Sequence, residues 1–67
     1  MLDKNKFKYF VADKGIQLNI LAAKMGISPA TLSRKLAGLS EFTRQEIQVY
    51  QSVTGVTDSE MMTIFFR

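Results

Sequence analysis

Apolar residues recur along this chain at intervals of three and four positions, in five short groups separated by polar or glycine-containing breaks. This interval places side chains on one face of an α-helix, which can then pack against a core. The pattern predicts helices over residues 3–14, 18–25, 28–37, 43–54 and 57–66, and no segment alternates as a strand does. We therefore expect an all-α chain folded as a compact bundle.

Two of the predicted helices begin with a strong sequence signal. Thr43 precedes Glu46 by three positions, and Thr57 precedes Glu60 by the same interval. In such a capping box, each of the two side chains bonds the backbone N–H group of the other residue. The two boxes predict where the fourth and fifth helices start, and Gly55 between them marks the end of the fourth.

The segment of residues 22–38, AAKMGISPATLSRKLAG, predicts two short helices joined by a tight turn. Gly26 suits the left-handed backbone that ends the first helix, and Ser28 followed by Pro29 is typical of the start of a second. Leu32 and Leu36 lie four positions apart, on the face expected to be buried. Two helices joined in this way form the helix-turn-helix motif of DNA-binding proteins. Taken alone, the second helix also fits an ordinary surface helix of a soluble protein.

The composition restricts the class of protein. At 67 residues the chain is a single domain, residues 1–67, near the lower size at which a domain folds alone. Its 46% of hydrophobic residues suits a packed core, and no apolar run is long enough to cross a membrane. Charged residues interrupt the first fourteen positions, which is unlike a signal peptide, so we expect a protein of the cytoplasm.

Residues suited to catalysis or metal binding are scarce. The chain has no cysteine and no histidine, which excludes disulfides, thiolate chemistry and the usual nitrogen and sulfur ligands of zinc. No phosphate-binding glycine loop is present. The acidic residues are scattered or explained as helix caps: Asp3, Asp13, Glu41, Glu46, Asp58 and Glu60. We expect neither an enzyme nor a bound cofactor or metal ion.

Positive charge is concentrated in the first two thirds of the chain. Residues 1–44 carry eight of the nine basic side chains and three of the six acidic ones. A basic region of this kind favours attraction to phosphates. For Lys4, Lys6, Lys8 and Lys14, however, we favour a simpler interpretation, which is the solvated face of the first helix.

The succession LAAKMGISPATLSRKLAG, followed by a capped helix, resembles the helix-turn-helix domain of phage repressors and Cro-type regulators, the XRE-like or lambda-repressor-like family. The match covers essentially the whole chain, and the ending EFTRQEIQVYQSVTGVTDSEMMTIFF is similar to that of small regulators of Gram-positive phages. The resemblance implies a five-helix domain whose second and third helices form the helix-turn-helix. It also implies a homodimer that binds operator sequences in double-stranded DNA and regulates transcription in the host bacterial cytoplasm.

The resemblance assigns DNA contacts to individual residues. The base-reading residues lie on the third helix: Pro29, Ala30, Thr31, Ser33 and Arg34. Of these, Arg34 is the strongest candidate because arginine can pair with guanine through two hydrogen bonds. The phosphate-binding residues lie at the starts of the second and third helices and beyond the third: Gln17, Asn19, Ser28, Lys35, Ser40 and Arg44. Gln17 fits a helix cap equally well, and Lys35 and Arg44 also fit simple solvent exposure.

Two positions depart from the family pattern, and both lose a polar DNA contact. Leu18 stands where a glutamine commonly opens the second helix, and Leu39 replaces a frequently basic loop residue. Together with Ile20 they offer apolar groups to a protein partner. The alternative is ordinary core packing, which we favour for Leu18 and find least convincing for Leu39.

The C-terminal segment holds more large apolar residues than one face of a helix can bury. Three of its residues are therefore assigned to a dimer or partner surface, Met62, Phe65 and Phe66, and the loop residue Leu39 is assigned to the same surface. In the alternative, Phe65 and Phe66 fold back on Phe7 and Phe10. A two-fold dimer would place its recognition helices about 34 Å apart and read a palindrome. The alternative function is a small antirepressor or modulator that binds another repressor protein.

Overall fold

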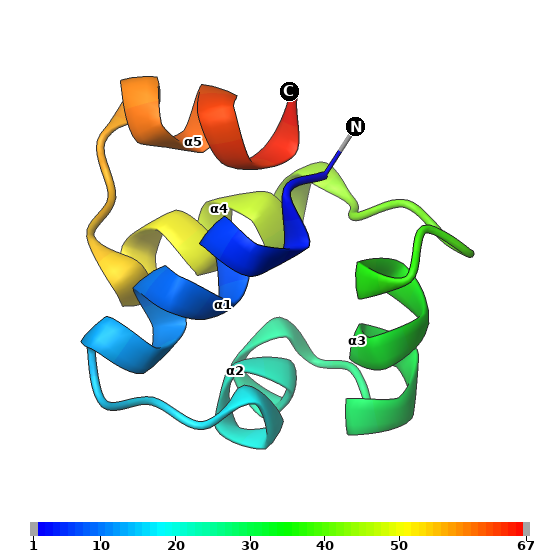
Figure 1. The fold of residues 1–67 in the computed structure, drawn as a ribbon. Coiled ribbons are helices and arrows are strands. Elements are labelled where there is room, and N and C mark those ends of the chain that lie inside the picture. The colour runs from blue at the N-terminus through cyan, green and yellow to red at the C-terminus, as the bar shows by residue number, and fades with distance from the viewer. Residues whose placement is uncertain (1, 67) are drawn as a thin grey trace.

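The computed structural model describes residues 2–66, which form five helices and no strand (Figure 1). The helices are α1 (Lys4–Asp13), α2 (Leu18–Met25), α3 (Pro29–Leu36), α4 (Arg44–Thr54) and α5 (Asp58–Phe65). The predicted all-α chain is confirmed, and every predicted helix limit agrees to within one residue. The small differences arise because the predictions included capping residues.

Local hydrogen bonds at the helix starts explain this agreement. Thr43 Oγ1 accepts from the N–H of Glu46 at 3.2 Å, and Glu46 Oε1 accepts from the N–H of Thr43 at 2.8 Å. The Thr57 and Glu60 pair repeats the arrangement at 3.1 and 2.8 Å. Both predicted capping boxes are therefore confirmed.

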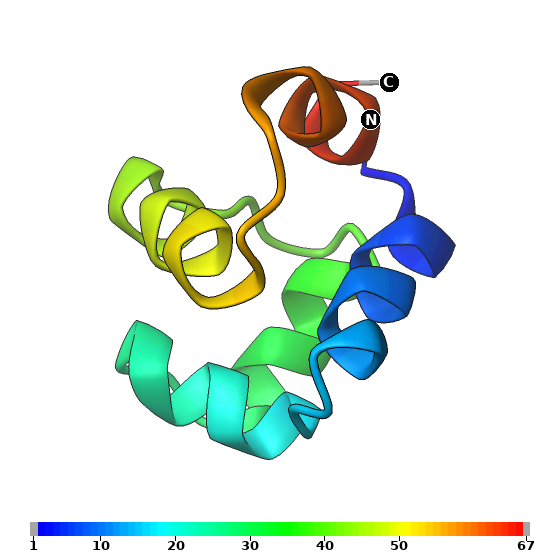
Figure 2. The same cartoon turned by 90° about the vertical axis from the view of Figure 1, so that its left-hand side faces the viewer.

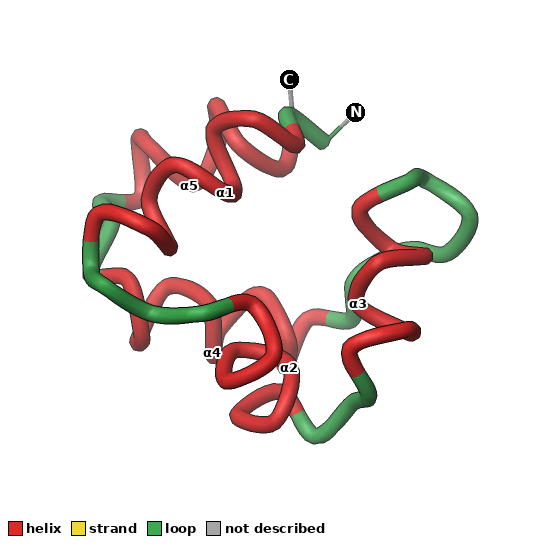
Figure 3. The backbone as a smooth tube through the Cα atoms, turned by 60° about the horizontal axis from the view of Figure 1, so that its bottom comes forward, coloured by secondary structure: helices red, strands yellow, loops and turns green. Residues whose placement is uncertain are grey.

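The turn between α2 and α3 gives the two helices different directions (Figure 3). Gly26 has a φ of 78°, a left-handed conformation that side chains other than glycine rarely adopt. The N–H of Ile27 donates to the carbonyl of Ala22 at 3.0 Å, which closes the end of α2. Ser28 then caps α3 by accepting from the N–H of Thr31 at 3.1 Å. The turn thus fixes how α3 leaves α2, and the two helices pack together.

An aromatic cluster joins α1, α4, α5 and the loop before α4. The ring of Phe7 stacks on that of Tyr50 with centroids 4.3 Å apart, and it stacks on Phe42 at 5.4 Å. Phe65 meets Phe7 edge-on at 5.9 Å. The Tyr50 hydroxyl donates to the carbonyl of Phe7 at 3.0 Å, so the buried O–H group is satisfied. Burial raises the pKa of Tyr50 far above its usual value, with a smaller contribution from the charge of Glu60.

The segment before α1 and the end of α5 lie close together (Figures 1 and 2). The N–H of Asp3 donates to the carbonyl of Ile64 at 2.7 Å, which connects the two segments. The helices α2 and α3 lie on the side of the molecule away from this connection (Figure 1). Core packing and the flanking loops join α3 to the other helices.

Within residues 2–66, none of the helices has the length and apolarity that crossing a membrane requires.

We predict that Tyr50→Phe destabilises the fold by about 1 kcal/mol, because the substitution removes the hydrogen bond to Phe7 and keeps the packed ring. Urea denaturation would measure the loss as a lower midpoint with an unchanged slope. The matched control is Tyr9→Phe, since the Tyr9 side chain is 63% exposed. Equal stability of the two variants would contradict a stabilising role for the buried hydroxyl.

Candidate nucleic-acid interface

The outer face of α3 carries four of the five side chains predicted to read bases. Pro29, Ala30, Ser33 and Arg34 are exposed, whereas Leu32 on the opposite face is 2% exposed and belongs to the core. This division follows from the helical repeat, which turns positions three and four apart toward the same side. The exposed face is short, most of its side chains are small, and Arg34 gives it a positive charge.

Thr31, the fifth predicted base-reading residue, is half-buried at the start of α3. The Ser28 hydroxyl donates to Thr31 Oγ1 at 2.9 Å while it accepts from the Thr31 N–H group. A hydroxyl group has one hydrogen to donate, so Ser28 uses its own within the cap. The Thr31 hydroxyl hydrogen remains to donate to an acceptor on a ligand.

Five of the six residues predicted to contact phosphates are exposed: Gln17, Asn19, Ser28, Ser40 and Arg44. Gln17 occupies the N-cap position of α2, but its side chain makes no capping hydrogen bond. The alternative interpretation of Gln17 as a helix cap is therefore confirmed for its position, and its side chain is left open to another partner. The first backbone N–H groups of α2 lack a side-chain acceptor, which suits a helix start that meets an anion.

Lys35 departs from the prediction because its side chain points into the protein. The residue is only 8% exposed, and its ammonium donates to Glu46 Oε1 at 2.7 Å and to the carbonyl of Glu41 at 3.0 Å. The ammonium also lies 5.8 Å from the centre of the Phe42 ring. The structure corrects the expectation that Lys35 is exposed and could contact phosphate. The two partners of Lys35 lie six and eleven positions further along the chain, outside the spacing of one helical turn, so the sequence carries no local signal for this contact.

Glu46 is the other half of this ion pair. Burial by itself would raise the pKa of its carboxyl, but the hydrogen bonds from Lys35 and from the N–H of Thr43 outweigh this effect and hold the pKa below its usual 4.5. A carboxyl whose pKa is lower in the folded protein than in the unfolded chain stabilises the fold at any pH above the pKa of the unfolded chain. This stabilisation is lost gradually as the pH falls from 4.5 through the lower pKa that Glu46 has in the folded protein.

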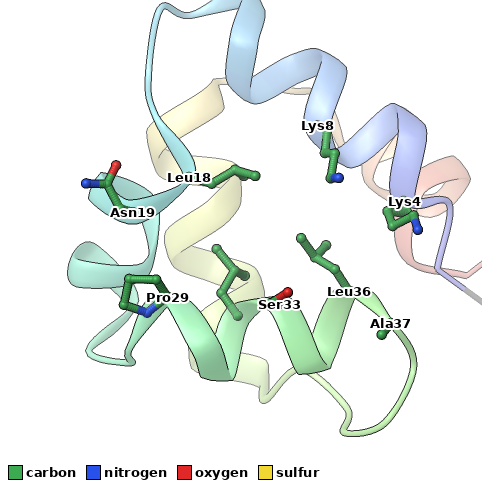
Figure 4. A pocket seen from close by; sticks show the side chains of 9 residues that line it. Lys4, Lys8, Leu18, Asn19, Pro29, Ser33, Leu36 and Ala37 are labelled. Carbon is green, nitrogen blue, oxygen red and sulfur yellow. The ribbon is translucent and has the colours of Figure 1, made fainter.

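A groove of ≈ 320 Å³ separates α1 from α3 (Figure 4). Lys4 and Lys8 of α1 form one side, and Pro29 and Ser33 of α3 contribute to the other together with Ala37, the C-cap of α3. The start of α2 also lines the groove. Both lysines are exposed, as expected from the sequence, but the groove beside them was not predicted. Their spacing of four, which puts them on one side of α1, was the available signal.

The residues assigned to a dimer or partner surface divide into two groups. Leu39, Met62 and Phe66 are 70%, 58% and 62% exposed. Phe65 is only 8% exposed and packs in the aromatic cluster, so its assignment to a surface is wrong and the alternative packing on Phe7 is correct. Phe66, in contrast, does not fold back into the core.

The two apolar residues of α2 that were considered for a partner surface, Leu18 and Ile20, differ in exposure. Leu18 is half-buried and packs against the core, as favoured from the sequence, whereas Ile20 is 47% exposed. A second groove, of ≈ 470 Å³, is lined by Phe66 together with Leu2, Phe42 and Ile47. The exposed apolar groups therefore lie on α2, on the loop after α3 and around the C-terminal end of α5.

Residues 2–66 contain no cluster of three or more acidic side chains able to hold a metal ion.

Comparisons with protein families, with curated proteins and with solved structures find no match to this chain.

We predict that Lys35→Met destabilises the fold by about 3 kcal/mol or more, because it leaves the Glu46 carboxylate buried without its partner. Thermal unfolding followed by circular dichroism would measure the change. Lys24→Met is the matched control, since Lys24 is exposed near the end of α2. If both variants unfold at the same temperature, the ion pair does not hold α3 in place.

Proposed function

We propose that the protein is a sequence-specific regulator of transcription that inserts α3 into the major groove of double-stranded DNA, in the manner of phage repressors and Cro-type proteins. The observation that carries the proposal is the outer face of α3, where Ala30, Ser33 and Arg34 are exposed on a helix whose other face is buried. The major groove is wide enough to admit one α-helix. We propose further that this regulator acts in the cytoplasm of a bacterial host.

The chemistry of this face suits the reading of bases. Ala30 allows the helix to approach the base edges closely, and the hydroxyl groups of Ser33 and Thr31 can bond donors or acceptors. Arg34 offers two parallel N–H groups to the O6 and N7 atoms of guanine. Gln17, exposed at the N-cap position of α2, would bond a phosphate and so set the register of α3.

The dimeric state proposed for the regulator rests on exposed apolar side chains. Phe66 borders the second groove and Met62 lies one turn earlier on α5, so both are open to a second copy of the chain. Burying such groups against a partner is favourable because it removes apolar surface from water. A two-fold dimer would present two α3 helices to a palindromic operator.

The second candidate function is that of a modulator that binds another repressor protein. The exposure of Leu39 and Ile20 favours it, because both positions lie next to the proposed DNA-binding elements and are apolar. A DNA reader binds duplex by itself, with affinity that falls steeply as salt rises. A modulator would bind duplex only weakly until its protein partner is added.

We predict that selection from a randomised duplex library enriches one sequence, and that Arg34→Ala weakens binding to it by about 1 to 3 kcal/mol and relaxes preference at one base position. Fluorescence anisotropy with the selected duplex and its single-base variants would measure both effects. Lys24→Ala, which removes one exposed charge from α2, is the matched control. Unchanged affinity and unchanged base preference of Arg34→Ala would contradict the role of this residue.

We also predict that Met62→Ser combined with Phe66→Ser shifts the protein from dimer toward monomer, because the interface loses its apolar area. Sedimentation equilibrium would measure the mass. Tyr9→Ser is the control, since Tyr9 is equally exposed but lies on α1. A wild-type protein that stays monomeric at high concentration would rule out the proposed dimer.

A further inference from the structure

Two lysines of α1 face the proposed recognition helix across a groove. Lys4 and Lys8 both line the groove of ≈ 320 Å³, and Ser33 lines it from α3 (Figure 4). Lys6, which lies between them in the sequence, does not line it. The helical repeat turns Lys4 and Lys8 to one side of α1 and Lys6 away from them.

The groove is suited to an anion. Its floor is apolar, and the only polar side chains in its lining are those of the two lysines, Asn19 and Ser33, with no acidic residue among them. Both lysines are exposed, and neither forms an ion pair with a residue in the described range 2–66. Two like charges one turn apart repel each other, so an anion placed between or beside them relieves that repulsion.

The position of the groove beside α3 favours one anion, the phosphate backbone of DNA. Pro29 and Ser33 of α3 and Ala37, its C-cap, follow one another at intervals of four, and with Leu32 and Leu36 they form the side opposite the lysines. A helix that lies in the major groove of DNA has a phosphate backbone along each of its flanks. The backbone on the α1 flank of α3 would therefore pass over Lys4 and Lys8.

We propose that Lys4 and Lys8 bind phosphates of the DNA strand that passes along the α1 side of α3. The inference rests on the proposed function, and it adds a contact that the family resemblance did not assign. Lysine acts on phosphate as a point charge on a flexible stem, so these contacts set the position of α3 and strengthen binding to every sequence alike. They also supply positive charge that the buried Lys35 does not offer.

The test compares two double variants that remove the same charge. Lys4→Gln with Lys8→Gln neutralises the groove, and Lys6→Gln with Lys14→Gln neutralises two other exposed lysines of the same region. Binding of each protein to a short fluorescent duplex of arbitrary sequence is measured by anisotropy at several salt concentrations. Circular dichroism during heating shows whether each variant keeps the fold.

We expect the groove variant to lower the slope of log affinity against log salt by about one unit per lysine, and the control to leave the slope nearly unchanged. Lys4→Arg with Lys8→Arg should restore the wild-type slope, because arginine keeps the charge. The loss should be equal for duplexes of different sequence, since phosphates carry no sequence information.

Equal slopes for the groove variant and the control would overturn the inference, because only the total charge of the protein would then matter. The salt dependence of the wild-type protein distinguishes this outcome from a failure of the proposed function. If the wild-type protein does not bind duplex with a clear salt dependence, DNA reading and the phosphate contacts are both wrong. If it does and the two double variants agree, only the role of Lys4 and Lys8 is wrong.

Discussion

The buried carboxylate of Glu46 joins three parts of the molecule. It closes the first turn of α4 by accepting from the N–H of Thr43, and it receives the ammonium of Lys35 from the last turn of α3. Lys35 in turn bonds the carbonyl of Glu41, which fixes the loop between the two helices. A charge taken out of water needs such partners, so the pair restricts α3 to one position.

The direction in which α3 faces depends on this restraint together with the Gly26 turn. The turn sets the start of α3 relative to α2, and the ion pair sets its end relative to α4. Leu32 fills the core between the two points, so Arg34 and its neighbours face outward. A DNA-reading helix must hold its side chains in register with base edges, and a helix fixed at both ends meets this requirement.

The sequence predicted those features that depend on residues close together in the chain. The capping boxes, the Gly26 turn and the helix limits follow from neighbours within five positions; the boxes and the turn are confirmed, and the limits agree to within one residue. The burial of Lys35 depends on Glu46, eleven positions away, and the packing of Phe65 depends on Phe7 at the other end of the chain. Composition and periodicity do not decide between such partners and a free surface, so the packing of Phe65 on Phe7 stood only as an alternative. The groove beside Lys8 was missed for the same reason, because its other side comes from α3.

The central claim is that α3 is the surface that meets DNA. The most direct test is a titration of the isotope-labelled protein with a duplex of arbitrary sequence at low salt, followed by NMR of the backbone amides. If α3 binds DNA, the largest shifts fall on residues 28–37 and on the start of α2. Shifts confined to α5 and the loop near Leu39, with α3 unchanged, would contradict it.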